Sequence, residues 1–489
     1  MVAIEVSKMK SEKEQQLIEQ AYAEIEKYQD MVEKDYYRLH YHLMPPVGLM
    51  NDPNGLIHWN GVYHVFYQWM PFHTGHGAKF WGHYTSCDLV HWKQENIALA
   101  PSEWFDKNGC YSGSAIDNNG VLTLFYTGNV KDEHGNRQTY QCMAVSKNGI
   151  DFEKKGVVVK LPDGYTAHFR DPKVWKKGEN WYMIVGAQSK SLDGLAVLFR
   201  SKNLFDWEHL GAIAGGNLNQ LGDFGYMWEC PDLFELDGQE VLLVCPQGLK
   251  AEGMKYHNVY QSGYFVGRLD YETAQFLHGP FTELDRGFEF YAPQTMLDAK
   301  GRRILIAWMG VPGQDEDKHP TIAHRWIHAL TLPRELKLKN GKLYQTPVEE
   351  LQMLRKDKIA YSNVTIANEE MMLEGISGDV IELNLENIRL LGGIMEIAIR
   401  NTARIIYNSG ERVLTLERKS FANGLTEKRQ CRLERLHSLH MFLDTSSIEV
   451  FVNEGEEVFT ARFFPYKNNQ TISFAANGHL VFDIQKWSL

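Results

Sequence analysis

The sequence is poor in cysteine, has no long apolar run and carries no excess of positive charge. Its 6 cysteines form no CxxC pair and no metal-ligand spacing, and most lie in strand-like apolar runs, which predicts reduced, buried thiols. No stretch approaches the ~18 apolar residues that a membrane-spanning helix needs. The net charge of −11 argues against a nucleic-acid or anionic-membrane partner, although a local group of His, Lys or Arg could still bind a small anion.

The bulk properties are typical of a globular protein with more than one domain. A chain of 489 residues is too long for one ordinary domain and predicts two, each with a substantial core. The apolar fraction of 44% and the charged fraction of 23% are typical of soluble proteins. The N-terminus contains no apolar segment followed by a cleavage site, so we expect a cytoplasmic location. The sequence leaves the oligomeric state open, a homodimer included.

An amphipathic helix is predicted near the N-terminus. Apolar residues recur at helical spacing among Glu, Lys and Gln between residues 9 and 34, for example Ile18, Ala21 and Ile25. We expect this helix, within an N-terminal segment of residues 1–36, to pack on the outside of the main domain.

The middle of the chain contains a repeat. Five segments share a turn glycine followed by a strand rich in aromatic and branched residues. The turn glycines are Gly61, Gly120, Gly178, Gly238 and Gly301. Successive glycines are 59, 58, 60 and 63 residues apart, and several short strands fit into each interval. Such a period predicts a β-propeller with one four-stranded blade per repeat, whereas chance spacing of unrelated sandwich strands remains the alternative.

The repeat ends before the last part of the chain, which predicts a second domain. A hairpin is predicted at Ser447–Phe459, within a stretch that partly alternates apolar and polar residues. We therefore expect an all-β protein, with a five-bladed β-propeller at 37–345, a short helical linker at 346–360 and an antiparallel β-sandwich at 361–489.

Three acidic residues recur at one place in the repeat. Asp52 lies in Asn51-Asp52-Pro53-Asn54-Gly55, Asp171 in Arg170-Asp171-Pro172 and Glu229 in Glu229-Cys230-Pro231. They precede their turn glycines by 9, 7 and 9 residues, which predicts a position on the innermost strand of each blade. Proline after each acid suits a strand that forms hydrogen bonds along one edge. Three acids at equivalent positions can point at one common axis.

Cleavage of a glycosidic bond needs two carboxyl groups, one to attack or orient and one to donate a proton. The third acid could hold sugar hydroxyls. Binding of Ca²⁺ or Mg²⁺ by the three acids is an alternative. No EF-hand spacing is present, and the aromatic residues beside the acids, Trp69, Phe169 and Trp228, suit sugar faces better than hydrated ions.

These motifs together resemble glycoside hydrolase family 32, the invertase and levanase type of β-fructofuranosidase. Further matching segments are Gln68 with Pro71, Phe80–His83, Tyr111–Ser114, Tyr291–Gln294 and Leu332–Leu336. The resemblance covers residues 36–489. Within the family the chain is most similar to the intracellular bacterial sucrose-6-phosphate hydrolases.

The resemblance implies a role for each acid. Asp52 would be the nucleophile that forms a fructosyl ester, Glu229 the general acid and then base, and Asp171 a stabiliser of the transition state, with Arg170 beside it. The family retains anomeric configuration, so the carboxyls of Asp52 and Glu229 should lie ~5–5.5 Å apart. The residues alone do not distinguish retention from inversion. Implied substrate contacts are Leu49, Met50, Asn51, Gln68, Trp81, Tyr111, Ser112, Arg170, Tyr291 and Trp308.

One position departs from many extracellular members of the family, which have a tryptophan that faces the leaving sugar. The corresponding residue is His76, followed by Lys79. An imidazole and an ammonium could bind a 6-phosphate on the leaving glucose. Alternatively, His76 binds a sugar hydroxyl and Lys79 is a solvated loop charge.

The expected function is therefore retaining hydrolysis of sucrose 6-phosphate, and of sucrose less specifically. We expect a small sugar as the binding partner and no metal or organic cofactor. Fructan cleavage, fructosyl transfer and a non-catalytic sugar-binding propeller are the alternatives. The presence of all three acids argues against the non-catalytic alternative.

Overall fold

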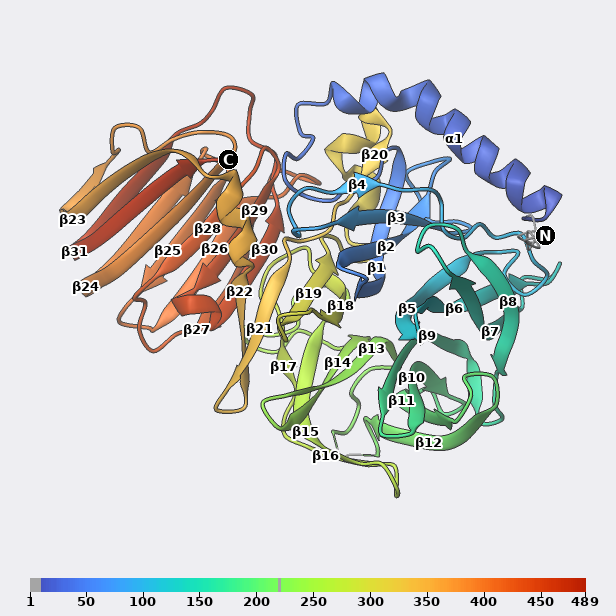
Figure 1. The fold of residues 1–489 in the computed structure, drawn as a ribbon. Helices are drawn as coiled ribbons and strands as arrows, with labels where there is room; N and C mark the ends of the chain where they lie inside the picture. Colours follow the sequence, from blue (N-terminus) through green and yellow to red (C-terminus); the bar gives the residue numbers. More distant parts are fainter. Residues whose placement is uncertain (1–9, 219–220) are drawn as a thin grey trace.

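The fold is a five-bladed β-propeller beside a β-sandwich, as the sequence predicted (Figure 1). The computed structural model describes residues 10–218 and 221–489. Blade one contains β1 (Gly48–Trp59), β2 (Val62–Met70), β3 (Phe80–Ser86), β4 (Lys93–Gln94) and the added β20 (Trp326–Ile327). Blade two contains β5 (Cys110–Asn118), β6 (Val121–Lys131), β7 (Arg137–Ser146) and β8 (Glu153–Lys160).

The remaining blades follow in chain order. Blade three contains β9 (Tyr165–Lys177), β10 (Asn180–Ser189), β11 (Gly194–Ser201) and β12 (Trp207–Gly215). Blade four contains β13 (Met227–Leu236), β14 (Gln239–Gln247), β15 (Gly263–Asp270), β16 (Gln275–His278) and β17 (Thr282–Glu283). Blade five contains β18 (Tyr291–Leu297), β19 (Arg303–Trp308), β21 (Arg334–Lys339) and β22 (Lys342–Pro347). The short 3-10 helices η1 (Glu316–Lys318) and η2 (Pro320–His324) lie between β19 and β20.

The first strands of the five blades surround the propeller axis. β1 contacts β5, β5 contacts β9, β9 contacts β13, β13 contacts β18, and β18 contacts β1 again. The late strand β20 pairs in parallel with β1, which ties the end of the propeller to its beginning. The three predicted acids lie on β1, β9 and β13, the innermost strands of their blades, as expected.

The turn glycines of the repeat join the first and second strands of each blade. At the first turn Asn60 and Gly61 have φ values of 51° and 80°, both in the left-handed region. Such a pair forms a two-residue turn that matches the twist of adjacent strands, and few residues other than Gly and Asn adopt it without strain. This local requirement is why the repeat was visible in the sequence.

The C-terminal domain is one continuous antiparallel sheet that folds over on itself. It contains β23 (Lys356–Met371), β24 (Ile381–Ile399), β25 (Ala403–Asn408), β26 (Val413–Lys419), β27 (Thr426–Arg432), β28 (Leu439–Leu443), β29 (Ser447–Val452), β30 (Glu457–Arg462) and β31 (Ile472–Ser488). The long β24 pairs with β25, β28 and β31, and its residues Leu383, Leu385 and Ile397 pack in the sandwich core. The predicted hairpin is β29 and β30, joined by η4 (Asn453–Gly455).

The segment between the domains is shorter than the helical linker predicted at 346–360. The 3-10 helix η3 spans Glu349–Leu354, and β23 already begins at Lys356. The acidic and amide residues of this segment gave it a helical composition, but β22 and β23 occupy both of its ends.

The N-terminal helix α1 (Glu12–Glu33) forms where amphipathic spacing predicted it (Figure 1). Ser11 caps it by accepting a hydrogen bond from the backbone N–H of Glu14. Ala21 and Val32 are buried in the same apolar cluster as core residues of blade one. No helix in the described ranges is both long and apolar enough to cross a bilayer. All six cysteines are free thiols, and Cys87 is exposed whereas the other five are buried as predicted.

A buried charged network joins the two domains. Arg334 on β21 donates from Nη1 to Asp285 Oδ2 at 3.0 Å and from Nη2 to Glu449 Oε2 at 2.6 Å. Glu449 lies on β29 of the sandwich and also lies 3.0 Å from Nε2 of His42. The side chains of all four residues are almost fully buried.

Candidate active site

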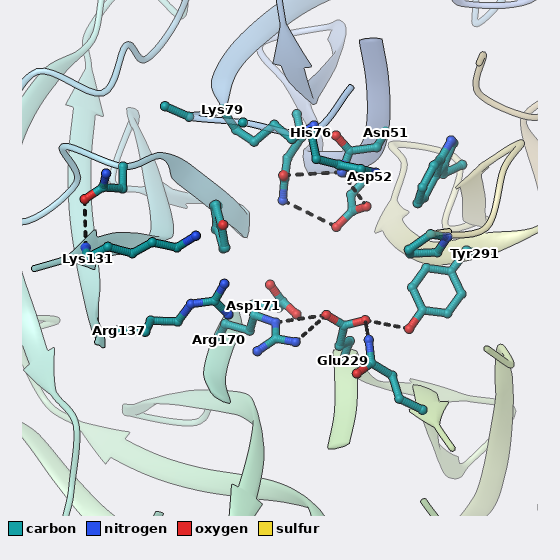
Figure 2. Close-up of a pocket in the computed structure, with 18 residues that line it drawn as sticks. Asn51, Asp52, His76, Lys79, Lys131, Arg137, Arg170, Asp171, Glu229 and Tyr291 are labelled. Carbon is teal, nitrogen blue, oxygen red and sulfur yellow. Dashed lines mark hydrogen bonds and ion pairs between the residues drawn. The ribbon is translucent and has the colours of Figure 1, made fainter. Parts of the chain in front are cut away.

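A cavity of about 470 Å³ opens at the propeller axis. Its walls come from loops and inner strands of all five blades (Figure 2). The lining residues are Asn51, Asp52, Gln68, His76, Gly77, Ala78, Lys79, Asn108, Tyr111, Lys131, Arg137, Arg170, Asp171, Glu229, Gln247, Tyr291, Trp308 and Pro312. The three acids of the sequence motifs therefore share one cavity.

A β-bulge at the same level of each innermost strand shapes the floor of the cavity. Between Met50 and Pro53 the register of β1 against β2 shifts, so that two residues face one. Equivalent irregularities occur in β5, β9, β13 and β18. A bulge changes the direction of the side chains and interrupts the hydrogen bonds between the two strands. Proline, which has no backbone N–H, is tolerated at such a position. The acid–proline pairs in the sequence are thus the signature of these bulges.

Asp171 lies in such a bulge with a strained backbone. Its φ is 68°, in the left-handed region that residues with a side chain rarely adopt. Its backbone N–H donates to Thr127 Oγ1 at 2.9 Å, and its Oδ2 accepts from the N–H of Cys230 at 3.0 Å. These contacts from neighbouring blades hold the side chain toward the axis. Strained positions of this kind cluster at functional sites.

Asp52 is held by neutral hydrogen-bond donors. Asn51 Nδ2 donates to its Oδ1 at 2.9 Å, Ser112 Oγ donates to its Oδ2 at 2.5 Å, and Gln68 Nε2 lies 3.4 Å from Oδ2. Gln68 Nε2 also donates to Ser112 Oγ. Burial raises the pKa of Asp52, and the hydrogen bonds from Ser112 and Asn51 oppose that rise. Among the described residues this carboxylate forms no ion pair, and its hydrogen-bond donors are neutral.

Glu229 is held by charged and neutral donors on both oxygens. Arg170 donates to Oε1 from Nε at 2.9 Å and from Nη2 at 2.6 Å. Gln247 Nε2 and the Tyr291 hydroxyl both donate to Oε2 at 2.6 Å. Burial by itself would raise the pKa of Glu229, but the charge of Arg170 and the hydrogen bond from Tyr291 outweigh it and lower the pKa.

The pKa of the third acid, Asp171, is shifted in the opposite direction from that of Glu229. Burial raises the pKa of Asp171 to about 7, against the opposing charge of Arg170, and the nearby charges of Glu229 and Asp52 add to the rise. Arg170 donates to Glu229 from Nε and Nη2, both to the same oxygen, Oε1. The pKa values of the two acids are therefore shifted in opposite directions, that of Glu229 down and that of Asp171 up.

Most of the predicted substrate contacts line the cavity. Asn51, Gln68, Tyr111, Arg170, Tyr291 and Trp308 all do so. Ser112 is fully buried, and it donates a hydrogen bond to Asp52, which lines the cavity.

Three of the predicted substrate contacts do not line the cavity. Leu49 and Met50 are fully buried in apolar clusters and precede the bulge, which begins after Met50. Trp81 lies on β3, two strands out from the axis, and its indole N–H donates to the backbone carbonyl of Tyr111 at 3.1 Å. The side chains of these three residues pack behind the residues that line the cavity.

The two residues predicted to bind a phosphate both line the cavity but have different surroundings. His76 Nε2 lies 3.1 and 3.2 Å from the carboxylate oxygens of Glu316, which also contacts His328. Lys79 is 3% exposed, and its Nζ has no hydrogen-bond partner among the described residues. Burial lowers the pKa of Lys79 to about 7, although the charges of Asp52 and Glu316 oppose this.

Several lining residues were missed by the sequence analysis. Gln247 follows an apolar strand and carries no motif, and Asn108 lies in a loop. Lys131 is the last residue of β6 and Arg137 is the first residue of β7. Charged residues are common at such hairpin ends because they keep the surface soluble, so these two did not stand out. Their relation to the cavity depends on the closure of the propeller, which no local pattern reveals.

Family comparison agrees with the geometry. The model of the glycosyl hydrolases family 32 N-terminal domain matches residues 42–347, and that of the family 32 C-terminal domain matches residues 350–488. The chain belongs to glycosyl hydrolase family 32. It is therefore a glycoside hydrolase, and the three acids occupy the cavity of its propeller.

Individual relatives are similar over nearly the whole chain. A sucrose-6-phosphate hydrolase of Bacillus subtilis (strain 168) is 56% identical over 477 residues, which cover 97% of this chain and 99% of the relative. The structure of a sucrose-6-phosphate hydrolase from Lactobacillus gasseri superimposes with a TM-score of 0.87 at 30% identity and covers 96% of both chains. A mutant Bombyx mori GH32 β-fructofuranosidase in complex with sucrose gives a TM-score of 0.83 at 32% identity and covers 96% of this chain and 97% of its own.

Proposed function

We propose that this family 32 enzyme hydrolyses sucrose 6-phosphate to fructose and glucose 6-phosphate, and sucrose less specifically, with retention of configuration. The observation that carries the proposal is the pair Asp52 and Glu229, which face one cavity from β1 and β13. The 56% identity to a sucrose-6-phosphate hydrolase over almost the whole chain supports the phosphorylated substrate.

The first step would form a covalent fructosyl ester. A carboxylate oxygen of Asp52 attacks the anomeric carbon of the fructosyl unit, while Glu229 gives a proton to the glycosidic oxygen. The carbon–oxygen bond to glucose 6-phosphate breaks, and glucose 6-phosphate leaves with that proton. Asn51 and Ser112, which already donate to Asp52, orient the attacking carboxylate.

The second step would hydrolyse the ester. Glu229, now ionised, takes a proton from water as the water oxygen attacks the same carbon, and Asp52 is released as a carboxylate. Each step inverts the configuration, so the product retains it. Asp171 and Arg170 would bind fructose hydroxyls, whose hydrogen bonds strengthen as positive charge develops on the ring.

Glu229 must alternate between a protonated and an ionised form in this cycle. Its donors Arg170, Tyr291 and Gln247 favour the ionised form, which the second step requires. We infer that a bound sugar draws hydrogen bonds from these donors and excludes water. Both effects raise the pKa of Glu229 for the first step.

The substrate is tested by measuring kcat/KM of the purified enzyme on sucrose 6-phosphate and on sucrose, in one buffer without phosphate. We expect a preference of about tenfold or more for the phosphorylated sugar, which is ~1.4 kcal/mol of transition-state binding. Equal values would identify an enzyme that ignores the phosphate. Inactivity on both sugars would favour the fructan-degrading or sugar-binding alternatives.

A further inference from the structure

We propose that Lys131 and Arg137, at the end of the β6–β7 hairpin, bind the 6-phosphate of the leaving glucose. This inference rests on the proposed function and names the part of the site that would select the phosphorylated substrate. Both side chains line the cavity and extend into it from the same side (Figure 2).

The two cations oppose each other directly. Lys131 on β6 and Arg137 on β7 form the last cross-strand pair of the hairpin. Like charges placed directly opposite each other on neighbouring strands are destabilising. An anionic ligand between the two side chains would remove this repulsion, and the arginine could bind two phosphate oxygens at once.

Acidic residues of the hairpin are engaged elsewhere. Asp132 Oδ1 accepts from the backbone N–H groups of His134 and Asn136, and its Oδ2 accepts from Asn136 Nδ2. Glu133 lies 3.9 Å from the ring of His134. Asp132 therefore shapes the turn. Across residues 10–218 and 221–489, neither Lys131 nor Arg137 forms an ion pair with a carboxylate.

The hairpin is fixed in position at the cavity. The backbone N–H of Lys131 donates to Asn108 Oδ1 at 2.7 Å, and Asn108 also lines the cavity. The guanidinium of Arg137 lies 5.9 Å from the centre of the Tyr111 ring, within reach of a cation–π contact. Lys131 is exposed, which places it at the mouth of the cavity, and its cross-strand partner Arg137 is half-buried. The leaving sugar would lie toward this mouth, because the fructosyl unit must contact Asp52.

His76 and Lys79 are less suitable for a doubly charged phosphate. His76 is paired with Glu316, whose pKa is lowered because His328 and His76 outweigh the effect of burial, and this carboxylate would repel a phosphate. Lys79 is buried beside the nucleophile, where the charge of Asp52 acts on it. We therefore assign His76 to a hydroxyl of the leaving sugar, as the sequence analysis allowed.

The test compares sucrose 6-phosphate with sucrose in Lys131→Gln, Arg137→Gln and the double variant. We expect the ratio of the two kcat/KM values to fall about threefold in each single variant and to approach one in the double variant, a loss of ~0.7 kcal/mol per cation. Inhibition by the product glucose 6-phosphate should weaken in parallel, while inhibition by fructose stays constant. Arg137→Lys, which keeps the charge, should retain part of the ratio.

The matched control is Lys160→Gln, because this lysine is exposed on β8 of the same blade and does not line the cavity. It should keep the wild-type ratio, and equal melting temperatures would confirm that all the variants fold.

Three results would overturn the inference in different ways. A wild-type enzyme that prefers the phosphorylated sugar, with a double variant that keeps this preference, contradicts the assignment of Lys131 and Arg137 and leaves the proposed function intact. A wild-type enzyme without any preference contradicts the proposed substrate itself. If the ratio of the two kcat/KM values falls in His76→Gln but not in Arg137→Gln, the phosphate binds at the wall that contains His76.

Discussion

The protein contains two buried clusters of carboxylates and arginines that have opposite consequences. At the domain interface, Arg334 lies between Asp285 and Glu449 and contacts both. In the propeller cavity, Arg170 contacts Glu229 Oε1 through Nε and Nη2, and Asp52 has neutral donors. Both clusters consist of carboxylates and an arginine, but the interface cluster is enclosed by packed side chains and the other lines an open cavity.

Each cluster contains acids whose pKa is shifted in both directions, since burial raises the pKa of Asp285 at the interface, and Arg170 and Tyr291 outweigh burial and lower that of Glu229 in the cavity. Burial would raise the pKa of Glu449, but Arg334 and His42 outweigh it and lower the pKa. In the cavity, burial raises the pKa of Asp52 and brings that of Asp171 to about 7. A buried carboxylate whose partners surround it stabilises the fold, whereas one with an open side and an incomplete set of partners can react.

The largest predicted effect follows from removing the nucleophile. Asp52→Asn should reduce kcat by more than ~10³-fold, because an amide cannot form the fructosyl ester. Its melting temperature should stay within a few degrees of the wild type, since the donors around Asp52 can also bind an amide oxygen. Steady-state kinetics and thermal unfolding measure the two effects, with the exposed Asp163→Asn as the control. Full activity in Asp52→Asn would exclude this residue as the nucleophile.

A substitution in the interface cluster should have the opposite effect, a loss of stability with little loss of activity. Arg334→Met removes the cation between two buried carboxylates and should cost about 3–5 kcal/mol in the free energy of unfolding. At a temperature where the variant remains folded, kcat/KM should change by less than about threefold, because Arg334 does not line the cavity.

Denaturant unfolding and kinetics on the same sample would measure both quantities. The matched control is Arg404→Met, which removes an exposed arginine paired with Glu417 and should cost under about 1 kcal/mol. A loss of activity in folded Arg334→Met, without a loss of stability, would mean that the two clusters are coupled and that their contrast is wrong.

A smaller effect concerns the pH dependence of stability. Because the folded pKa of Asp171 is about 7, compared with an ordinary value of 3.8, the folded state binds more protons than the unfolded chain between these values. The free energy of unfolding contributed by this group is therefore highest at acid pH and falls as pH rises toward 7. Asp171→Asn should stabilise the protein at pH 8 more than at pH 5, by a few kcal/mol at most.

Thermal unfolding at the two pH values measures this difference. Asp163→Asn, the same substitution at an exposed position, is the matched control. An equal change in melting temperature at both pH values for Asp171→Asn would contradict a raised pKa at Asp171.

The features that the sequence predicted are those that depend on local chemistry. The turn glycines were visible because a two-residue turn restricts φ, as at Asn60 and Gly61. The acids were visible because each bulge on β9 and β13 places a proline beside a functional side chain. Their similar positions in the repeat, 9, 7 and 9 residues before the turn glycines, then brought them to one axis. The amphipathic helix α1 was predicted for the same kind of reason, a period of apolar residues.

The features that the sequence did not predict depend on distant contacts. Glu316 meets His76 across 240 residues of chain, and this pairing changes what the imidazole can bind. Leu49 adjoins the Asn51-Asp52 motif, but its side chain packs in an apolar cluster with Met70 and Ile327, which are distant in the sequence. The role of Arg334 at the interface required both domains to be in place.

The account rests most on a covalent fructosyl ester at Asp52, and trapping it is the most direct measurement. Glu229→Gln should still form the ester from an aryl β-fructofuranoside, whose leaving group needs no proton, but should hydrolyse it slowly because the base is lost. Mass spectrometry of a protease digest should then show one added fructosyl group on the peptide that contains Asp52. An added group on the peptide of Asp171, or release of fructose without any modified peptide, would contradict the account.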